Sequence, residues 1–529
     1  MDRKVTRRAF IGLTVGGGAA ALGSTGLLTG CTPAAPQAAP VSGSPAARLS
    51  HRARPAVPES ALPGDGDWEI RNLGAEHEIE GYAGKASVLP GESVPLFVSS
   101  APRWFTVTAY RIGWYQGAGA RKLWRSSSLR GGAQRSSAVT GATTTVTTDW
   151  DPVTEVPTDG WPAGSYLLRL DADSGAQRYV PLTVRSQETA GRVVMKNCVQ
   201  TWQAYNQWGG YDLYMGPSGA YDDRSLAVSL DRPYDSNGAN MFLTYERNAI
   251  KLAEYLSATS GLPLAYLTSM DIAEDPQALR GAAALVSMGH DEYWTPGERA
   301  NVTAARNAGV NIAFLGANAV FRRTRLSSTA VGDSRLVVCY KTSTDPAAAA
   351  NPALATTNFT SSPHPDPESS LTGTSYEGYP VDASYVVTSP SSWVFAGTGV
   401  KGGSSFPHLV GVEYDRVNPG YPVPRPIEVL SHSPLTLDGA ASYADSAYYT
   451  CMSGAGVFNS GTMRWVEAIY GDQPHGIGGA TPGMVRQVTA NVLRAFAGGP
   501  AAARYPARDN LDATHEYSGD PVGSPGNLQ

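Results

Sequence analysis

The sequence is poor in charged residues for its length. Charged side chains make up 16% of its 529 residues, and the 41 Lys and Arg are outnumbered by 46 Asp and Glu, which gives a formal net charge of -5. A protein that binds nucleic acid needs clustered positive charge to neutralise phosphates. The composition therefore argues against a nucleic-acid partner, while the apolar content of 42% is enough for several hydrophobic cores.

Cysteine is scarce as well. The chain has four, Cys31, Cys198, Cys339 and Cys451, and none of them forms a Cys-x-x-Cys pair. Their spacing argues against a zinc ribbon or a thiol redox centre. If Cys31 is consumed by processing, the other three allow at most one disulfide. We interpret these three mainly as small, buried apolar residues.

The N-terminal region has no long, uninterrupted hydrophobic run. The apolar segment that follows Arg7 and Arg8 is short and broken by glycines, so it is a poor membrane span. The paired arginines resemble a twin-arginine export signal, and LTGC at residues 28–31 resembles a lipoprotein cleavage box. The resemblance implies a signal over residues 1–31 and a lipid on Cys31. An ordinary signal peptide cleaved nearby is the alternative.

These signals predict where the protein acts. We expect export by the twin-arginine route, followed by lipid anchoring on the outer side of the cytoplasmic membrane or by secretion. Residues 32–63 are rich in Ala, Pro and Ser and predict a tether, so only the lipid would contact the membrane. Because twin-arginine routes carry folded proteins, often with a cofactor already loaded, the signal also favours a bound cofactor.

Residues 64–186 consist of short alternating apolar runs separated by Gly, Pro and Asp turns. The runs at residues 94–98, 105–110 and 166–170 are examples. Short strands at this spacing, without helical periodicity, are typical of an all-β sandwich of immunoglobulin-like size. We expect such a sandwich here.

Strands alternate with helices in residues 187–500. The pattern predicts, among others, a strand at 192–195 and a helix at 241–258. Such alternation is typical of an α/β domain with a doubly wound, mostly parallel sheet. Within it, residues 326–425 predict a β-rich insertion or lid, and residues 501–529 predict a loose tail.

Polar side chains concentrate after one predicted strand. The apolar run at residues 283–288 predicts a buried strand, and His290, Asp291 and Glu292 follow it closely. TPGE at residues 295–298 combines an N-cap threonine, a first-turn proline and a glutamate three residues on, which predicts a helix start. Since open parallel sheets bind ligands at the carboxyl ends of their strands, we expect His290 and Glu292 to project into a crevice.

An unusually long connection, residues 198–240, is expected to leave the same edge of the sheet. Four motifs near this edge carry a family resemblance: TWQAYNQWGG (201–210), SLDRPY (229–234), GHDEYW (289–294) and LGANxxFxR (315–323). Together they resemble the catalytic region of the large (beta) subunit of N,N-dimethylformamidase. The resemblance is best over residues 191–325 and weaker at residues 454–465.

The resemblance implies a mononuclear non-haem iron, held by two tyrosines and one glutamate, that hydrolyses an amide C–N bond. Glu292 matches the carboxylate ligand and Tyr205 matches the first tyrosine. We choose Tyr214 as the second tyrosine. Tyr211 and Tyr221 remain alternatives, because the connecting segment differs in length from that of the family.

The chemistry of this donor set agrees with the resemblance. Two phenolates and a carboxylate are hard anionic ligands, which suit Fe(III) better than Zn(II). A tyrosine, with an ordinary pKa near ~10, becomes a ligand at neutral pH only when a strong cation replaces its proton. The metal would act as a Lewis acid, while His290 or Glu292 handles the proton.

We assign His290, Asp291 and Glu292 to catalysis. Three further residues are expected to orient the ligands through hydrogen bonds: Asn206, Asn318 and Arg232.

Most of these residues also have a purely structural interpretation. Asp291 could cap the following helix, and His290 could be a core histidine. Arg232 and Arg322 could pair with a nearby carboxylate such as that of Glu292.

The same turns also resemble class I glutamine amidotransferase-like folds. Those enzymes place a nucleophilic Cys at a strand-to-helix elbow, where this chain has Met288, Gly289 and His290. Thiol catalysis is therefore disfavoured. The glycine-rich turn at residues 454–460 lacks the lysine of a phosphate-binding loop.

These features predict an exported, metal-dependent hydrolase of amide or related C–N bonds, acting on a small-molecule or envelope-derived amide. The leading alternative is a non-catalytic cell-envelope protein that recognises glycans through its aromatic residues, on an α/β domain without the metal. A zinc or thiol amidase is the third possibility. The sequence leaves the substrate and the oligomeric state open.

Overall fold

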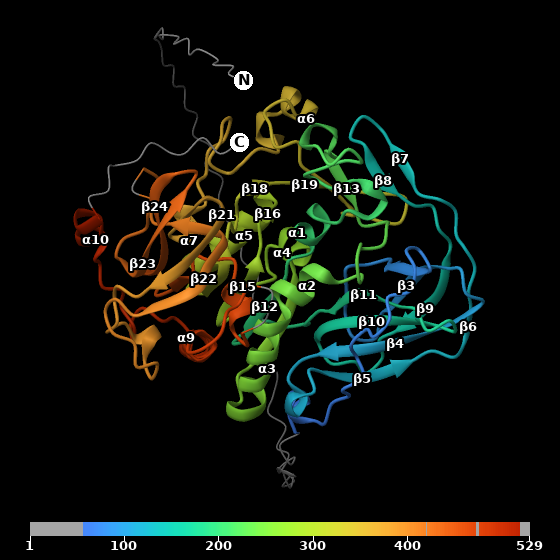
Figure 1. Cartoon of the computed structure of the whole chain (residues 1–529), viewed down its shortest axis with the longest axis horizontal. Helices are drawn as coiled ribbons and strands as arrows, with labels where there is room; N and C mark the ends of the chain where they lie inside the picture. Colours follow the sequence, from blue (N-terminus) through green and yellow to red (C-terminus); the bar gives the residue numbers. More distant parts are fainter. Residues whose placement is uncertain (1–56, 419, 472–474, 519–529) are drawn as a thin grey trace, which may run out of the picture. The chain divides into compact units, whose positions relative to one another are not determined.

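The computed structural model of the chain describes residues 57–418, 420–471 and 475–518 (Figure 1). The expected signal, with Arg7, Arg8 and Cys31, lies outside the described residues, as does most of the expected tether. In the described ranges, each helix is too short or too polar to cross a bilayer.

The first part of the described chain forms two sheets around one core. One sheet has the order β1-β3-β9 and the other the order β2-β11-β10-β4-β5, with β6 beside β4. The strands are β1 (Ile79–Ala83), β2 (Ser87–Val88), β3 (Ser93–Ser100), β4 (Trp104–Ile112), β5 (Ala120–Arg125), β6 (Leu129–Arg130), β9 (Pro152–Pro157), β10 (Gly164–Ala172) and β11 (Gln177–Val184). Val94, Leu96 and Val98 alternate along β3 and all face the shared core. A small hairpin, β7 (Ala138–Thr140) and β8 (Thr145–Thr147), lies apart from both sheets.

The central element of the second part is a seven-stranded sheet with the order β14-β12-β15-β17-β25-β24-β23. Its strands are β12 (Val193–Asn197), β14 (Leu264–Thr268), β15 (Ala284–His290), β17 (Asn311–Ala317), β23 (Ile427–Leu437), β24 (Ala440–Thr450) and β25 (Gly456–Asn459). The first five in this order are parallel, whereas β24 and β23 are antiparallel to their neighbours.

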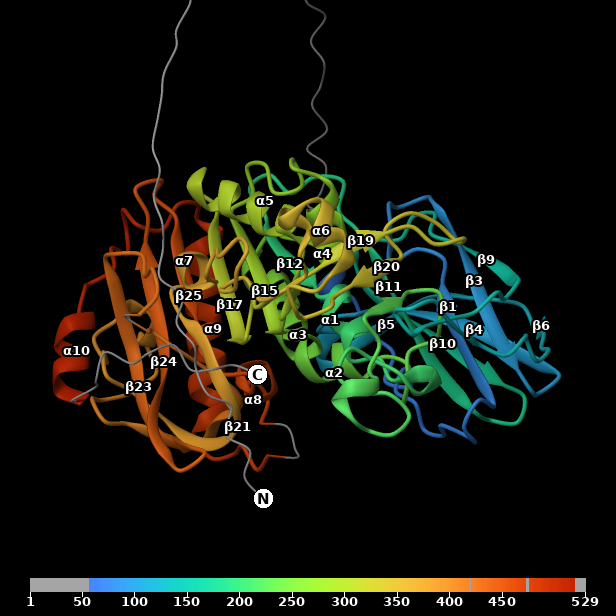
Figure 2. The ribbon, with the colours of Figure 1, turned by 90° about the horizontal axis from the view of Figure 1, so that it is seen from above.

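Alternate residues of the parallel strands enter two different cores. Val193 and Met195 of β12 lie in the core that contains Leu252 of a helix on one face, and Val194 lies in the core that contains Val302 on the other. Figure 2 shows α4 and α5 on one side of β12 and β15, and α3, α8 and α9 on the other. The α-helices are α1 (Val199–Ala204), α2 (Asn240–Tyr245), α3 (Arg247–Ser260), α4 (Ser269–Glu274), α5 (Pro296–Asn307), α6 (Pro346–Ala350), α7 (Ser369–Thr372), α8 (Trp465–Ala468), α9 (Thr481–Ala497) and α10 (Leu511–Ser518).

Three small sheets complete the second part. They are β13 (Ala227–Ser229) with β20 (Leu336–Val338) and β19 (Arg325–Ser327), β16 (Tyr293–Trp294) with β18 (Arg322–Arg323), and β21 (Ser375–Val386) with β22 (Ser405–Arg416). The tail that was expected to be loose is docked as far as it is described, since Asn510 donates to the carbonyl of Val429 at 3.0 Å.

The expected fold class is wrong. Strands dominate the described residues, they form seven separate sheets, and twelve of the eighteen strand pairs are antiparallel. A doubly wound, glutamine amidotransferase-like fold is therefore not shown, and neither is an immunoglobulin-like one. The region before the seven-stranded sheet is β-rich as expected, but its sheets differ in size and one includes a parallel pair, β2 with β11.

A hairpin turn accounts for part of the error. Asp438 and Gly439 join β23 to β24 and have φ angles of 49° and 80°. Two central residues with positive φ are the mark of a type I′ turn, which reverses the chain without a helix. The chain beyond residue 425 therefore returns as antiparallel strands.

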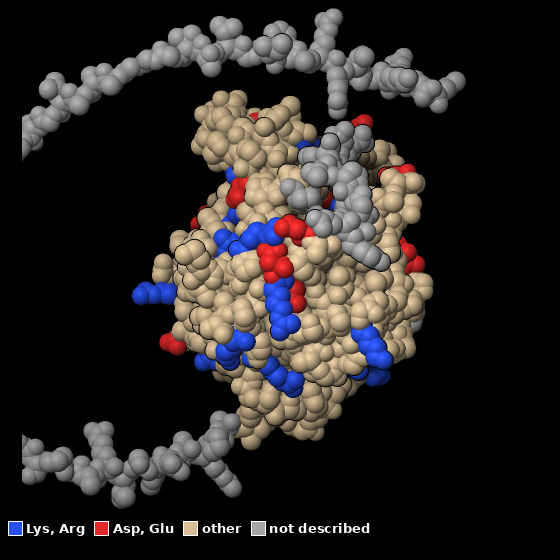
Figure 3. Space-filling model, turned by 90° about the vertical axis from the view of Figure 1, so that its left-hand side faces the viewer, with Lys and Arg blue, Asp and Glu red and all other residues tan. Residues whose placement is uncertain are grey.

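The two parts meet through buried polar contacts. Nη2 of Arg111 in β4 lies 2.6 Å from Oε1 of Glu254 in α3, with both side chains buried. The chain from Val57 onwards forms one compact unit. On the face in Figure 3, uncharged residues cover most of the area, acidic and basic side chains lie together near the middle, and the charged side chains in the lower part are mainly basic.

Of the three described cysteines, Cys198 and Cys339 are buried and Cys451 is partly exposed. All three are free thiols. The structure therefore forms no disulfide among the described residues.

Candidate functional site

The site is built where β15 ends. Gly289 has a φ angle of 56°, and a Cβ there would lie 2.3 Å from the carbonyl oxygen of Tyr245 in α2. A Cβ on Gly316, its partner in β17, would lie 1.6 Å from the carbonyl oxygen of Gly289. Both positions require glycine. Because α2 and β17 pack so closely against Gly289, they determine the backbone path that leads to His290.

The long connection after β12 brings two tyrosines to this strand end. Tyr205 is the C-cap residue of α1. The backbone N–H groups of Tyr214 and Met215 donate to Asp212 Oδ1 at 2.6 and 2.8 Å, which folds the loop into a turn. The buried guanidinium of Arg232 holds the same loop by donating to three carbonyls, those of Asn206, Trp208 and Tyr211.

Tyr205, Tyr214 and Glu292 meet at this edge. The Tyr205 hydroxyl lies 2.7 Å from Glu292 Oε2, and the Tyr214 hydroxyl lies 2.7 Å from each carboxylate oxygen. The two hydroxyl oxygens are 3.0 Å apart, and the rings stack with centroids 4.7 Å apart. We call these three residues the oxygen triad. Glu292 is buried, whereas each tyrosine keeps part of its surface exposed.

Two cationic side chains border the oxygen triad. Nε of Arg322 donates to Glu292 Oε1 at 3.2 Å. Nζ of Lys341 lies 3.2 Å from the centre of the Tyr214 ring, a cation–π contact, and has no hydrogen-bond partner among the described residues. The charge of Glu292 is therefore balanced by nearby positive charge.

His290 and Glu413 close the other side of the site. Nε2 of His290 lies 2.8 Å from the Tyr205 hydroxyl, and its Nδ1 lies 3.7 Å from Glu413 Oε2. Asn318 donates from Nδ2 to the same Glu413 oxygen at 2.9 Å. Its backbone is held with a φ angle of 57° by an N–H bond of 2.7 Å to Asp415 Oδ1.

The electrostatics of the oxygen triad follow from burial. Burial raises the pKa of Tyr205 and of Tyr214 well above the ordinary value, and Glu292 raises both further. Burial also acts to raise the pKa of Glu292, but Arg322 and His290 oppose it and leave the pKa below its ordinary value. At neutral pH the triad therefore consists of two neutral phenols that donate to one carboxylate.

The neighbouring groups are also shifted. Burial lowers the pKa of His290, so its ring is neutral at pH 7. Burial raises the pKa of Glu413 well above the ordinary value, and Glu292 raises it further, which keeps that carboxyl protonated. Burial, followed by Arg322, lowers the pKa of Lys341 to about 7. Several groups that can hold a proton thus surround the triad.

The oxygen triad fits a hard cation. Metal–oxygen bonds of about 2.0–2.1 Å at right angles place neighbouring oxygens about 2.9 Å apart. The separations in the triad are 2.7 and 3.0 Å. Two phenolates and a carboxylate would be hard donors that suit a trivalent cation. Over the described part of the chain, His, Cys, Asp and Glu alone form no metal-binding group of three or more, so this donor set depends on its tyrosines.

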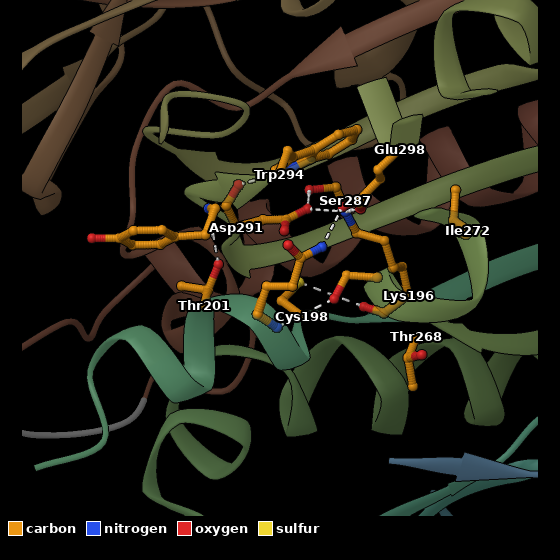
Figure 4. Close-up of polar contacts among 12 residues, drawn as sticks. Lys196, Cys198, Thr201, Thr268, Ile272, Ser287, Asp291, Trp294 and Glu298 are labelled. Atoms are coloured by element: carbon orange, nitrogen blue, oxygen red, sulfur yellow. Dashed lines mark hydrogen bonds and ion pairs between the residues drawn. The ribbon is translucent and has the colours of Figure 1, made fainter. Parts of the chain in front are cut away.

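Asp291, which was expected to take part in catalysis, does not join the triad. Its Oδ2 lies 2.5 Å from Nζ of Lys196 and accepts a hydrogen bond from Ser287 Oγ at 2.6 Å (Figure 4). Successive side chains of an extended segment point in opposite directions, so Asp291 faces away from its two neighbours. Nor does it cap α5, whose N-cap is Thr295.

Asn206 and Arg232, which were expected to orient the ligands, contact the loop rather than the triad. Asn206 donates to the carbonyl of Pro233 at 2.9 Å, and Arg232 binds only carbonyl oxygens. Both shape the segment that carries the tyrosines. Asn318 lies at the site, but it contacts Glu413 and not a member of the triad.

The two alternative tyrosines are elsewhere. Tyr221 is 45% exposed, and the Arg224 guanidinium lies 3.8 Å from the centre of its ring. Tyr211 lies in the loop, where its carbonyl accepts a hydrogen bond from Arg232. Tyr214 is the tyrosine that the structure brings to Tyr205 and Glu292.

No motif pointed to Lys341 or Glu413. Both lie in the region that was expected to be an insertion, and neither belongs to a motif. Arg322 was considered only as a structural partner, and it does pair with Glu292. An isolated charged residue in an irregular segment carries no spacing that reveals its partner.

Comparisons with known proteins match one family and several chains of solved structures. No curated protein matches the chain. A crystal structure of a Paenibacillus sp. cycloisomaltooligosaccharide glucanotransferase with cycloisomaltoheptaose matches with 12% identity over 24% of this chain and 17% of that chain. The TM-score of this match is 0.14. A family model matches residues 106–476, a range that begins within β4 and includes the oxygen triad. The chain belongs to the N,N-dimethylformamidase beta subunit-like, C-terminal family.

Proposed function

We propose that this protein is a hydrolase of amide C–N bonds and that the oxygen triad holds one Fe(III) ion at its active site. The observation that carries the proposal is the meeting of three oxygen donors within 3.0 Å of one another. Family membership supports the reaction class. When bound, the ion would supply Lewis acidity, which polarises an amide carbonyl and makes a water molecule more acidic.

The chain's own residues handle protons and orientation. His290 is neutral at pH 7 and its Nε2 lies beside the Tyr205 oxygen, so Nε2 can accept a proton from the attacking water molecule and then give it to the leaving amine. Arg322 fixes the Glu292 carboxylate. Asn318 orients Glu413, which faces the second nitrogen of His290.

Family membership suggests the substrate class, since the chain belongs to a dimethylformamidase-like family. The hollow beside Tyr205, lined by Trp202, Met241 and Phe242 among others, has a volume of about 20 Å³ and has room for about one water molecule. We propose small N-substituted amides as the substrate class, from free or envelope-derived sources.

A glycan-binding role has less support. A large cleft among the described residues has a volume of about 850 Å³, and its lining includes Lys85, Arg185, Asp271 and Arg335 but no aromatic side chain. Sugar rings are usually stacked on exposed aromatic rings, and none is available there.

Metal analysis tests the proposal directly. Protein purified without chelators is expected to contain one iron per chain and to show a visible tyrosinate charge-transfer band. Tyr205→Phe, Tyr214→Phe and Glu292→Gln should each abolish both signals, whereas the matched control Tyr221→Phe should retain them. Wild-type protein that stays colourless and iron-free after addition of ferric iron would overturn the metal site.

Activity and location need separate assays. Release of amine from a panel of small N-alkyl amides is expected from the iron-loaded protein and not from Glu292→Gln. We further propose export by the N-terminal signal and attachment through Cys31. Fractionation should find the protein in the membrane fraction, and Cys31→Ala should release it; a cytoplasmic wild-type protein would contradict this proposal.

A further inference from the structure

A completely buried lysine lies beside the turn that carries Glu292. Nζ of Lys196, in β12, lies 2.5 Å from Asp291 Oδ2, 2.7 Å from Glu298 Oε1 and 3.6 Å from the centre of the Trp294 ring (Figure 4). All three charged side chains are at most 2% exposed. Although burial lowers the pKa of Lys196, the two carboxylates raise it above the ordinary value, so the ammonium stays charged.

On the Glu298 side of this ion cluster, hydrogen bonds continue to two further residues. Nε2 of Gln200 donates to Glu298 Oε2 at 2.8 Å, and the Thr324 hydroxyl donates to Gln200 Oε1 at 2.7 Å. We call Lys196, Asp291, Glu298, Gln200 and Thr324 the lysine network. Its members come from five different segments of the chain.

Three of these segments also carry groups of the active site. Asp291 immediately precedes Glu292, and Gln200 lies in α1, whose C-cap residue is Tyr205. Thr324 follows two residues after Arg322, the partner of Glu292.

A direct contact joins two of the segments again. The backbone N–H of Tyr293 donates to Thr201 Oγ1 of α1 at 3.2 Å. The lysine network therefore connects the backbones that present Tyr205, Glu292 and Arg322.

Removal of the ammonium would disturb this arrangement. Without the ammonium, the buried Asp291 carboxylate would lose its counter-charge beside Glu298, a carboxyl whose pKa burial already raises to about 8. Breaking a buried ion pair on one side is strongly destabilising, because the remaining charge stays desolvated. The turn would have to shift or admit water, and Glu292 would move with it.

We propose that Lys196 is a positioning residue for the oxygen triad. Its ammonium joins Asp291 to Glu298 and, through Gln200 and Thr324, sets the distance between the Tyr205 hydroxyl and the Glu292 carboxylate. Because Lys196 is 0% exposed, it acts through these residues and not on a substrate. The inference rests on the proposed function, since the distance it sets is the one that a bound cation requires.

The test compares Lys196→Met with a matched control, Arg335→Met. Arg335 is also buried and pairs with a buried carboxylate, Asp231, at 2.5 Å, but it otherwise binds backbone carbonyls outside the site. Ferric iron is added as a chelate, and its affinity is measured from the tyrosinate band. Lys196→Met is expected to bind iron roughly 10- to 100-fold more weakly than wild type, as loss of a ligand-orienting group does in other metal sites.

The control separates positioning from general stability. Both variants are expected to lose stability towards denaturant, but Arg335→Met should keep the wild-type iron affinity. Equal affinity in Lys196→Met and wild type, or an equal loss in both variants, would overturn the inference. If Lys196→Met does not fold, Thr324→Val replaces it. That variant removes one hydrogen bond of the lysine network, and unchanged iron affinity would then be the contrary result.

A crystallographic readout is independent of the metal. Crystal structures of wild type and of the tested variant give the distances between the three triad oxygens with or without iron. Wider distances in the variant support the inference even if the wild-type protein binds no iron, which would defeat only the proposed function. Unchanged distances would overturn the inference in either case.

Discussion

Replacing Lys341 with methionine is expected to stabilise the protein at pH 7. Its ammonium is buried against the Tyr214 ring with no hydrogen-bond partner among the described residues, and its pKa falls from 10.5 to about 7. At about 1.4 kcal/mol for each tenfold step, this fall makes the lysine destabilising by roughly 4 kcal/mol at pH 7 relative to an exposed one. Methionine keeps the apolar stem and removes the charge. We therefore expect Lys341→Met to raise the free energy of unfolding by about 2 to 4 kcal/mol.

The pH dependence of this difference in stability follows from the number of protons that the folded and unfolded states bind. Between pH 7 and about 10.5 the unfolded lysine holds a proton that the folded one has released, so the wild-type protein gains stability as pH rises. The advantage of Lys341→Met should therefore be largest at or below pH 7 and should vanish towards pH 10. Urea unfolding from pH 6 to pH 10 measures it, with the exposed Lys401→Met as the control. A variant that is less stable than wild type, or a difference that does not change with pH, would refute the reasoning.

Three further predictions concern single groups. Arg322→Leu is expected to lower the free energy of unfolding by about 3 to 5 kcal/mol, because buried Glu292 loses its guanidinium; chemical denaturation measures this, and an unchanged midpoint would contradict it. Glu413→Gln should gain stability relative to wild type as pH rises from 4.5, since a carboxyl with a raised pKa stabilises the fold fully only below its unfolded pKa. Unfolding at pH 5 and pH 8 measures the difference in unfolding free energy between variant and wild type, and a difference that is equal at both pH values would refute the prediction. Gly439→Ala should cost about 1 to 2 kcal/mol, because alanine must adopt the left-handed φ of 80°; an unchanged melting temperature would argue against the type I′ turn.

Local structure near the site could be predicted because short-range signals determine it. The helix expected to start at residues 295–298 is α5 (Pro296–Asn307), and its start carries the expected threonine cap. The capping box is incomplete, however, because the Glu298 side chain binds Lys196 instead of turning back to the helix end. A long-range ion pair thus overrode a local preference.

The fold class could not be predicted in the same way. Hydrophobic periodicity distinguishes a strand from a helix, but it does not give the direction of the neighbouring strand. The periodicity of β23 and β24 therefore did not reveal that they are antiparallel, and only Asp438-Gly439 between them indicated a hairpin. That dipeptide was the available signal for an antiparallel half of the sheet.

The site was predicted in part, and the turn at residues 290–292 shows where prediction stopped. The motif identified three adjacent polar residues, but adjacency does not reveal which of them share a face. His290 and Glu292 reach Tyr205, whereas Asp291 reaches Lys196 on β12. Only the three-dimensional path of the chain separates the two groups.

Because Asp291 and Glu292 face different partners, separate ion pairs can hold the turn in place. Each buried carboxylate of the turn has its own cation, since Glu292 pairs with Arg322 and Asp291 with Lys196. Because an unpaired buried charge costs several kcal/mol, a movement of the turn that breaks either pair is strongly opposed. The two ion pairs act on neighbouring residues and from different strands, so together they restrict rotation of the turn as well as its displacement. Glu292 is therefore held in place by the protein itself, and the site does not need a ligand to organise it.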